Sequence, residues 1–251
     1  MAPPRTSDPL APLVELPGVG EAVTRARDAL VVLHNHPVNR RGWPATAAEA
    51  ALRAARASAA LEGARIDAVA EETVTDPVLS GAVRAAEEIG KLLGVWRSAP
   101  LQAMARLHLV AAADLVPTDR RTAELGRPHG TAEVSARLAL LADMVTGGTR
   151  VPGPVLVAVV HGELLALRPF ASANGVVARA AARLAAVVAG LDPHGLAVPE
   201  VGHLRARKAY RESAAGFAAG STAGLAAWIV HCCAQWEAGA REGVAIADAR
   251  S

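Results

Sequence analysis

Apolar residues recur along this chain at the three- and four-residue spacing of an α-helix. Between Gly20 and Leu33, for example, Val23, Ala26 and Leu30 fall on one face. The same spacing predicts helices over residues 46–61, 76–95, 100–115, 131–145, 152–167, 174–191, 203–217 and 221–236. No segment has the alternating pattern of a strand, so we expect an all-α fold.

Capping residues and turn formers mark the ends of several of these helices. Thr46 and Ser221 are predicted N-caps, because a hydroxyl accepts a hydrogen bond from the free backbone amides of the first turn. Gly63 is expected near the end of the second helix, where glycine adopts the left-handed conformation easily. Residues 116–130 have a turn-forming composition and poor strand propensity, which predicts an irregular loop.

These elements divide the chain into four parts. Residues 1–17 are rich in proline and are predicted to form a flexible extension. N-terminal helices (18–75), a helical core (76–238) and a C-terminal tail (239–251) follow. The N-terminus lacks a basic start followed by an apolar run, so we expect no signal peptide. The adjacent Cys232 and Cys233 exclude a disulfide framework and fit buried positions in a cytoplasmic protein.

The composition narrows the class of protein. Hydrophobic residues make up 52% of the chain but aromatic ones only 3%, so alanine, leucine and valine must build the core, and alanine favours helix. Charges of both signs are interspersed and sum to +2, which argues against a nucleic-acid-binding surface. Residues 16–20 resemble the hairpin of a helix-hairpin-helix motif, but the proline-rich segment before them favours a plain helix start.

The run from Ala214 to Trp236 contains no charged residue and has two interpretations. Gly216, Gly220 and Gly224 have the spacing of a membrane-helix dimerisation face. Alternatively, two buried soluble helices meet near Gly220. The serine, threonine, histidine and glutamine within the run favour the second interpretation, so we expect no contact with a membrane.

The histidines do not predict a metal site. His161 and His108 lie in apolar helices, which predicts hydrogen-bonded core residues. His34 and His36 have no further ligands beside them, so a solvated loop is the simpler interpretation. The HCC sequence at 231–233 is a poor metal site, because neighbouring side chains diverge on a helix.

The segment from 167 to 184 joins a loop of small residues to the start of a helix. Asn174 and Gly175 open this helix, and Arg179 and Arg183 follow one turn apart. The free amides and the positive dipole end of a helix N-terminus suit an anion.

Residues 168–179, RPFASANGVVAR, resemble the HPFxDGNGRxxR signature of the Fic family. The matching residues are Pro169, Phe170, Asn174, Gly175 and Arg179. Members usually transfer AMP from ATP to a hydroxyl of a target protein, and the resemblance implies a Fic-like helical bundle. Residues 56–67 are similar to the family's inhibitory motif, S/T-x-x-x-E-G/N, through Ser58, Glu62 and Gly63. The family pattern extends to further positions of the chain, which are His161, Tyr210, Gly224 and Trp228.

Three departures from the signature remove side chains that the transfer needs, and a fourth replaces a glycine. Arg168 stands where the family has its histidine, and a guanidinium with a pKa above ~12 accepts no proton at neutral pH. Ser172 replaces an acidic residue, and a neutral hydroxyl binds Mg²⁺ more weakly than a carboxylate. Val176 replaces a phosphate-binding arginine. Ala173 replaces a glycine, at little cost unless the position requires a positive φ.

The resemblance implies that Glu62 and Arg179 pair and close the site against productive nucleotide binding. We expect this ion pair to fix the N-terminal inhibitory helix on the core. Ser58, one turn before Glu62, is expected to bond to the motif loop or to its own helix. The residues predicted to bind a phosphate or nucleotide are Ser172, Ala173, Asn174, Gly175 and Arg179.

We therefore expect a Fic-type pseudoenzyme that binds nucleotide or phosphate and acts through contacts with an unidentified protein. A second hypothesis is a divergent adenylyltransferase with another base, for which His129 in the 116–130 loop, the region of the family's flap, is a candidate. A third is a purely structural protein. The sequence calls for no resident metal or cofactor, although weak binding of ATP with Mg²⁺ and a homodimer are both compatible with it.

Overall fold

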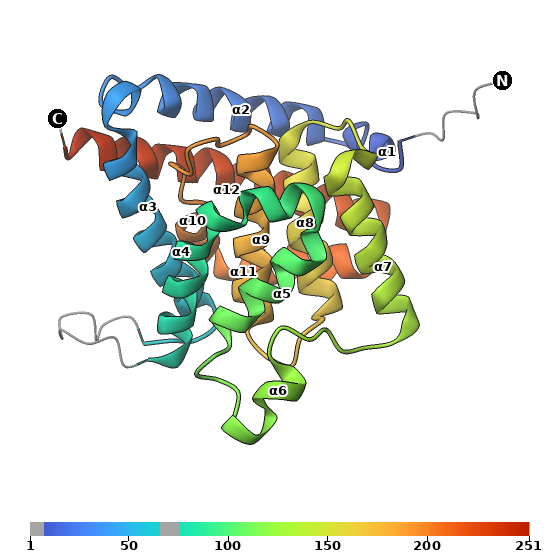
Figure 1. The fold of residues 1–251 in the computed structure, drawn as a ribbon. Helices are drawn as coiled ribbons and strands as arrows, with labels where there is room; N and C mark the ends of the chain where they lie inside the picture. Colours follow the sequence, from blue (N-terminus) through green and yellow to red (C-terminus); the bar gives the residue numbers. More distant parts are fainter. Residues whose placement is uncertain (1–7, 66–75, 251) are drawn as a thin grey trace.

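The computed structural model describes residues 8–65 and 76–250, and every regular element in these two ranges is helical, as predicted (Figure 1). The helices are α1 (Ala11–Val14), α2 (Val19–Asn35), α3 (Asn39–Leu61), α4 (Pro77–Ser98), α5 (Pro100–Ala111), η2 (Thr118–Arg120), α6 (Arg121–Glu124), α7 (Ala132–Asp143), η3 (Met144–Gly148), α8 (Gly153–Leu167), α9 (Asn174–Val188), α10 (Pro199–Arg205), α11 (Arg207–Ala218) and α12 (Thr222–Asp248).

Helix α9 lies at the centre of the fold, and each of its residues from Asn174 to Ala186 is buried. Helices α3, α4, α5 and α8 pack around it. Alanine and valine make up most of α9, and the two arginines within it are buried with polar partners, so the whole helix is enclosed. The anion-binding segment predicted from the sequence therefore begins the central helix of the core.

The chain before α2 is packed against the core. Asp8 accepts hydrogen bonds from the hydroxyl of Thr149 at 2.8 Å and from the amide of Arg150 at 2.6 Å. Gly18, with φ 77°, precedes Val19, the first residue of α2. The predicted flexible extension is thus anchored over residues 8–17 and contains the short helix α1. Residues 1–7, and residues 66–67 of the segment that resembles the inhibitory motif, lie outside the described ranges.

Helix α3 begins earlier than predicted. It starts at Asn39, whose side-chain amide donates to the backbone oxygen of Leu33 at 2.9 Å and holds the turn between α2 and α3. Pro44 lacks one backbone donor but does not end the helix. The prediction of Thr46 as an N-cap is wrong, because this side chain is buried inside the helix.

Helices α2 and α12 lie side by side along one edge of the molecule (Figure 1). α12 continues to Asp248, well past its predicted end at residue 236, so most of the predicted tail is helical. Gly239 and Gly243 weaken helix propensity, but a Cβ at either position would overlap backbone atoms of the 196–199 segment. Close packing on that segment therefore explains both the glycines and the length of α12.

The apolar run over 214–236 forms the end of α11 and half of α12. The two helices meet at Gly220 as predicted, and the Ser221 hydroxyl caps α12 by accepting from the amide of Gly224 at 3.1 Å. Gly216 and Gly224 contact each other through their backbones. Their spacing thus serves a turn within the chain. The helix predicted over 203–217 is in fact two, α10 and α11.

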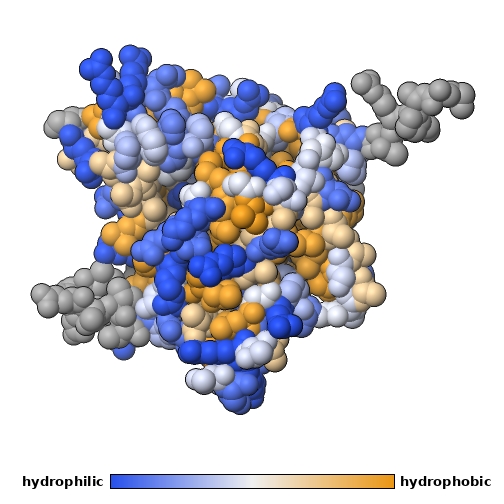
Figure 2. All heavy atoms as spheres, in the orientation of Figure 1, coloured by the Kyte–Doolittle hydropathy of each residue, from blue (hydrophilic) through white to orange (hydrophobic). Residues whose placement is uncertain are grey.

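None of the helices in the described ranges is long and apolar enough to cross a membrane. On the face that carries α4 and α5, hydrophilic and hydrophobic residues are mixed (Figure 2). This mixing agrees with the interspersed charges of the sequence.

Candidate active site

The loop between α8 and α9 has two residues in the left-handed region. Arg168 follows α8 with φ 44°, and Ala173 precedes α9 with φ 54°. A side chain in this region costs about 1–2 kcal/mol, so alanine at 173 is not free of cost. Asn174 closes the loop by accepting from the amide of Phe170 at 3.0 Å and donating to its carbonyl at 2.7 Å. Its side chain is thus committed to the loop.

The N-terminus of α9 has no side-chain cap in the described part of the chain. Alanine at 173 has no capping oxygen, so the first amides of the helix remain free to donate. The Ser172 hydroxyl oxygen is buried and has no hydrogen-bond partner among the described residues. This end of α9 therefore offers donors that an anion fits.

The C-terminus of α3 is shaped to present Glu62. Gly63 has φ 96°, its amide donates to Ala60, and the amide of Ala64 donates to Ala59, which is the Schellman pattern. Glycine permits this left-handed turn directly after Glu62. The helix therefore ends with the Glu62 side chain directed at α9.

Arg179 binds the last turn of α3 and is itself 2% exposed. It donates to the Ser58 hydroxyl at 2.8 Å, to the Ser58 carbonyl at 3.0 Å and to the Glu62 carboxylate at 2.8 Å. The predicted Glu62–Arg179 ion pair is present, and Ser58 bonds to the last arginine of the motif rather than to its own helix. Burial alone would lower the pKa of Arg179, but Tyr210 and Glu62 raise it.

The Glu62 carboxylate lies directly against Gly175, where a Cβ would overlap it. It therefore occupies space beside the first turn of α9. A phosphate brought to these amides would meet a carboxylate of the same charge. Because Glu62 is 34% exposed, it has room to move away.

A cluster of buried tyrosine and histidine rings lies next to Arg179. Tyr210 accepts from Arg179 at 3.2 Å, and its hydroxyl lies 2.8 Å from Nε2 of His161. Nδ1 of His203 lies 3.1 Å from Nε2 of His231. Burial lowers the pKa of His161 and His203 well below the usual value and that of His231 to about 4, and raises the pKa of Tyr210 to about 12. His161 is thus a hydrogen-bonded core residue, as predicted.

Arg183 takes no part in the anion site. Its Nε donates to Glu200 at 2.7 Å and its Nη2 to the carbonyl of Ala197 at 2.7 Å. The side chains of Arg183 and Glu200 are 10% and 4% exposed. The sequence did not reveal this pair, because nothing in the turn-rich segment before Glu200 predicts which residue faces α9.

The other positions that resemble the family signature differ in their exposure. Arg168 is exposed and has no partner in the described ranges, and Val176 is buried among apolar side chains. No group of three or more acidic, histidine or cysteine side chains in those ranges is placed to hold a metal ion. Glu62 is paired, and Ser172 is a single neutral hydroxyl, so the donor set does not fit a divalent ion held by protein ligands.

The 116–130 loop is attached at two points beside the motif. The amide of Gly126 donates to Nδ1 of His108 at 3.0 Å, and the amide of His129 donates to the carbonyl of Pro169 at 2.8 Å. His108 stacks on Phe170 with centroids 4.2 Å apart. The loop contains the short helices η2 and α6 and no strand among its residues, consistent with the irregular flap predicted.

Two further sequence interpretations are resolved by the packing. The solvated loop expected at His34 and His36 is wrong, because these side chains pair with Asp192 at 2.9 Å and Asp248 at 3.1 Å. Both aspartates come from elements remote in sequence, so no local pattern predicts the pairs. The cysteines at 232 and 233 are buried as expected.

The sequence matches no family model and no curated protein. Solved structures do resemble it. A Fic family protein from Desulfovibrio desulfuricans G20 aligns with a TM-score of 0.63 at 20% identity, over 98% of this chain and 77% of that one. A fragment of Fic-1 from C. elegans aligns with a TM-score of 0.71 at 16% identity, over 96% and 76%. A variant of that fragment gives 0.72 at 15% identity, over 97% and 76%. The chain has the all-α fold of Fic proteins.

Proposed function

We propose that this chain is a Fic-type protein that binds a phosphate or nucleotide at the start of α9 and does not transfer AMP. Its function is then exerted through the proteins that it contacts. The proposal is supported by a contrast within the loop between α8 and α9, which keeps hydrogen-bond donors for an anion but has no proton acceptor for the transfer. The amides of α9 and the Ser172 hydroxyl have free donors, whereas the position of the family's histidine holds an exposed arginine that accepts no proton.

Glu62 regulates this site in the proposal. Its carboxylate lies against Gly175 and pairs with Arg179, so an incoming phosphate must displace it. Removing the carboxylate also leaves Arg179 free to bind the ligand. We therefore expect the affinity for an anion to be limited by Glu62.

Calorimetric titration with ATP, with and without Mg²⁺, tests the proposal. We expect weak binding to the natural chain and at least tenfold tighter binding to Glu62→Ala. Arg41→Ala, a change of an exposed residue of α3 outside the site, should leave the affinity unchanged. If ATP binds neither the natural chain nor Glu62→Ala, the proposal is contradicted and the hypothesis of a purely structural protein is favoured.

An assay for labelled AMP on protein separates the proposal from the adenylyltransferase hypothesis. We expect no incorporation by the natural chain or by Glu62→Ala. Incorporation that is lost in His129→Ala would favour the second hypothesis, since the His129 backbone is bound to the motif loop. Incorporation gained by Arg168→His with Ser172→Asp and Glu62→Gly would show that the scaffold still supports transfer.

A further inference from the structure

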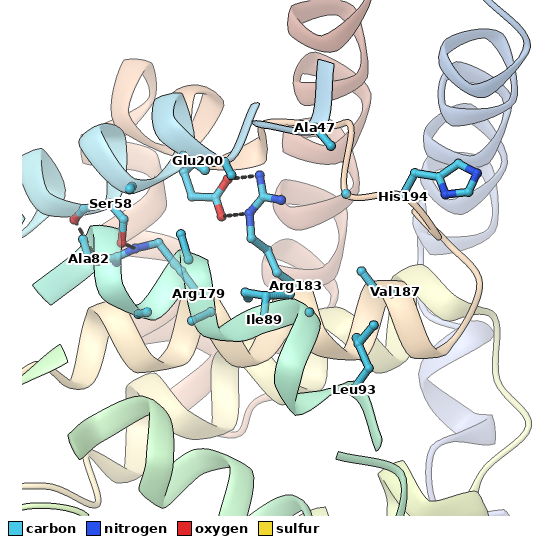
Figure 3. Close-up of a pocket in the computed structure, with 18 of the residues that line it drawn as sticks. Ala47, Ser58, Ala82, Ile89, Leu93, Arg179, Arg183, Val187, His194 and Glu200 are labelled. Carbon is cyan, nitrogen blue, oxygen red and sulfur yellow. Dashed lines mark hydrogen bonds and ion pairs between the residues drawn. The ribbon is translucent and has the colours of Figure 1, made fainter. Parts of the chain in front are cut away.

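A separate pocket lies between α3, α4, α9 and the loop that follows α9 (Figure 3). Its volume is about 300 Å³, at the small end of ligand-binding pockets. The space exists because the side chains that face one another here are mostly alanines. Their methyl groups are too small to fill the gap between the helices. The alanines that line it are Ala47, Ala51, Ala54, Ala55, Ala82, Ala85, Ala86 and Ala180. Interiors are otherwise filled to high density, so this open pocket is space that a small molecule could occupy.

One buried polar group faces this pocket with an unused donor. Nε and Nη2 of Arg183 bind Glu200 and a backbone carbonyl, but Nη1 has no hydrogen-bond partner among residues 8–65 and 76–250. Figure 3 shows this third nitrogen pointing away from Glu200, toward the side where Ala47, His194 and Val187 lie. Nη1 therefore reaches the space of the pocket, and its N–H groups can donate to a molecule that binds there.

The charges around the pocket decide which acceptor fits. Arg183 is already neutralised by Glu200, and Arg179, which also lines the pocket, is neutralised by Glu62. A carboxylate on Nη1 would lose its hydration beside the buried Glu200 carboxylate, and an ammonium would face two guanidinium groups. A neutral oxygen accepts from Nη1 without either penalty.

We propose that this pocket binds a small neutral aliphatic molecule that carries one hydrogen-bond acceptor, such as a ketone or an amide. The acceptor binds Nη1 of Arg183, and the apolar body lies on the alanines and on Ile89 and Leu93. The pocket shares Val176 and Arg179 with the anion site at the start of α9, but Ser172 and Gly175 do not line it.

Three probes of equal chain length test the proposal, namely 2-octanone, octanoate and octylammonium. Binding is followed by ligand-observed NMR and by the emission of Trp43, which lines the pocket and stacks on His194 at 4.4 Å. We expect 2-octanone to bind at least tenfold more tightly than either charged probe. Tighter binding of a charged probe, or no binding of 2-octanone up to its solubility, would overturn the proposal.

Matched variants locate the binding. Ala51→Leu fills the pocket from α3, and we expect it to weaken 2-octanone binding at least tenfold. Ala48→Leu, on the exposed side of the same helix, should leave binding unchanged. Arg183→Lys keeps the charge beside Glu200 but removes the Nη1 donor, and we expect about tenfold weaker binding. Equal binding by the Ala51 and Ala48 variants would place the probe elsewhere and contradict the proposal.

Discussion

Arg179 and Arg183 lie one turn apart on α9, both buried, and yet their carboxylate partners differ. Glu200, the partner of Arg183, is 4% exposed, whereas Glu62, the partner of Arg179, is 34% exposed. An ion pair enclosed on both sides cannot open without burying an unpaired charge. An ion pair open on one side can exchange its carboxylate for water or another anion. The first arginine therefore belongs to a replaceable contact, and the second to a permanent one.

Acid should destabilise the fold around both arginines, and this effect should be the largest. His161 and His203 lie with the two arginines around a small cavity, and burial lowers the pKa of both histidines. The unfolded chain therefore takes up protons first as pH falls below about 6.5, and the folded state loses stability on the order of 2 kcal/mol per histidine by pH 5. Stability is unaffected by these groups above pH 7.

Urea unfolding at pH 7, 6 and 5 measures this loss. His194→Gln, which removes an exposed histidine, should leave the slope unchanged. Equal stability of the natural chain at pH 7 and pH 5 would mean that the histidine cluster is not held neutral in the fold.

Glu200→Ala should be the most damaging single substitution of the two ion pairs. It leaves the Arg183 guanidinium buried without its partner, and such a loss costs about 3–5 kcal/mol. Equilibrium unfolding in urea measures the change. A cost below about 1 kcal/mol would show that Arg183 reaches solvent when Glu200 is removed, and that the two arginines do not differ.

Glu62→Ala should cost less, about 1–3 kcal/mol. Arg179 keeps its bonds to Ser58 and Tyr210, and water can replace the exposed carboxylate. The same urea titration measures the change, with Glu62→Gln as the variant that keeps the shape and removes the charge. A cost equal to that of Glu200→Ala would contradict the distinction between a replaceable and a permanent pair.

Gly175→Ala should have the smallest effect, and its sign should depend on residue 62. In the natural chain the new Cβ displaces the Glu62 carboxylate, which we expect to lower stability by about 1 kcal/mol. In Glu62→Ala the overlap with the carboxylate is gone. Nη1 of Arg179 must still shift slightly from its 3.1 Å distance to the new Cβ, and alanine should then stabilise the helix by up to about 1 kcal/mol. A double-mutant cycle measures how far the effects of the two substitutions on the free energy of unfolding depend on each other. The same effect of Gly175→Ala in both backgrounds would show that Gly175 and Glu62 do not interact.

The sequence predicted the parts of the site that local chemistry determines. The loop of small residues before Asn174 indicated where α9 begins, and Gly63 indicated where α3 ends. The meeting of Glu62 with Arg179 came from the family resemblance, since the two residues are far apart in the chain and no spacing rule joins them.

What the sequence did not predict depends on packing between distant segments. Glu200 pairs with Arg183 only because α10 packs against α3 and α12, which places Glu200 beside α9. The length of α12 depends on Gly239 fitting against the backbone at residues 198–199. A glycine lowers helix propensity, but it stabilises the fold where it allows two backbones to pack closely. Such contacts are visible only in the folded chain.

The burial of Val176 limits which side chains this position of α9 accepts. An arginine there would begin from the wall of the alanine-lined pocket, where the carboxylate of Glu200 is already paired with Arg183. A single substitution would therefore add a cation without a free partner. We expect this position to accept a charged residue only together with compensating changes in the residues that line the pocket.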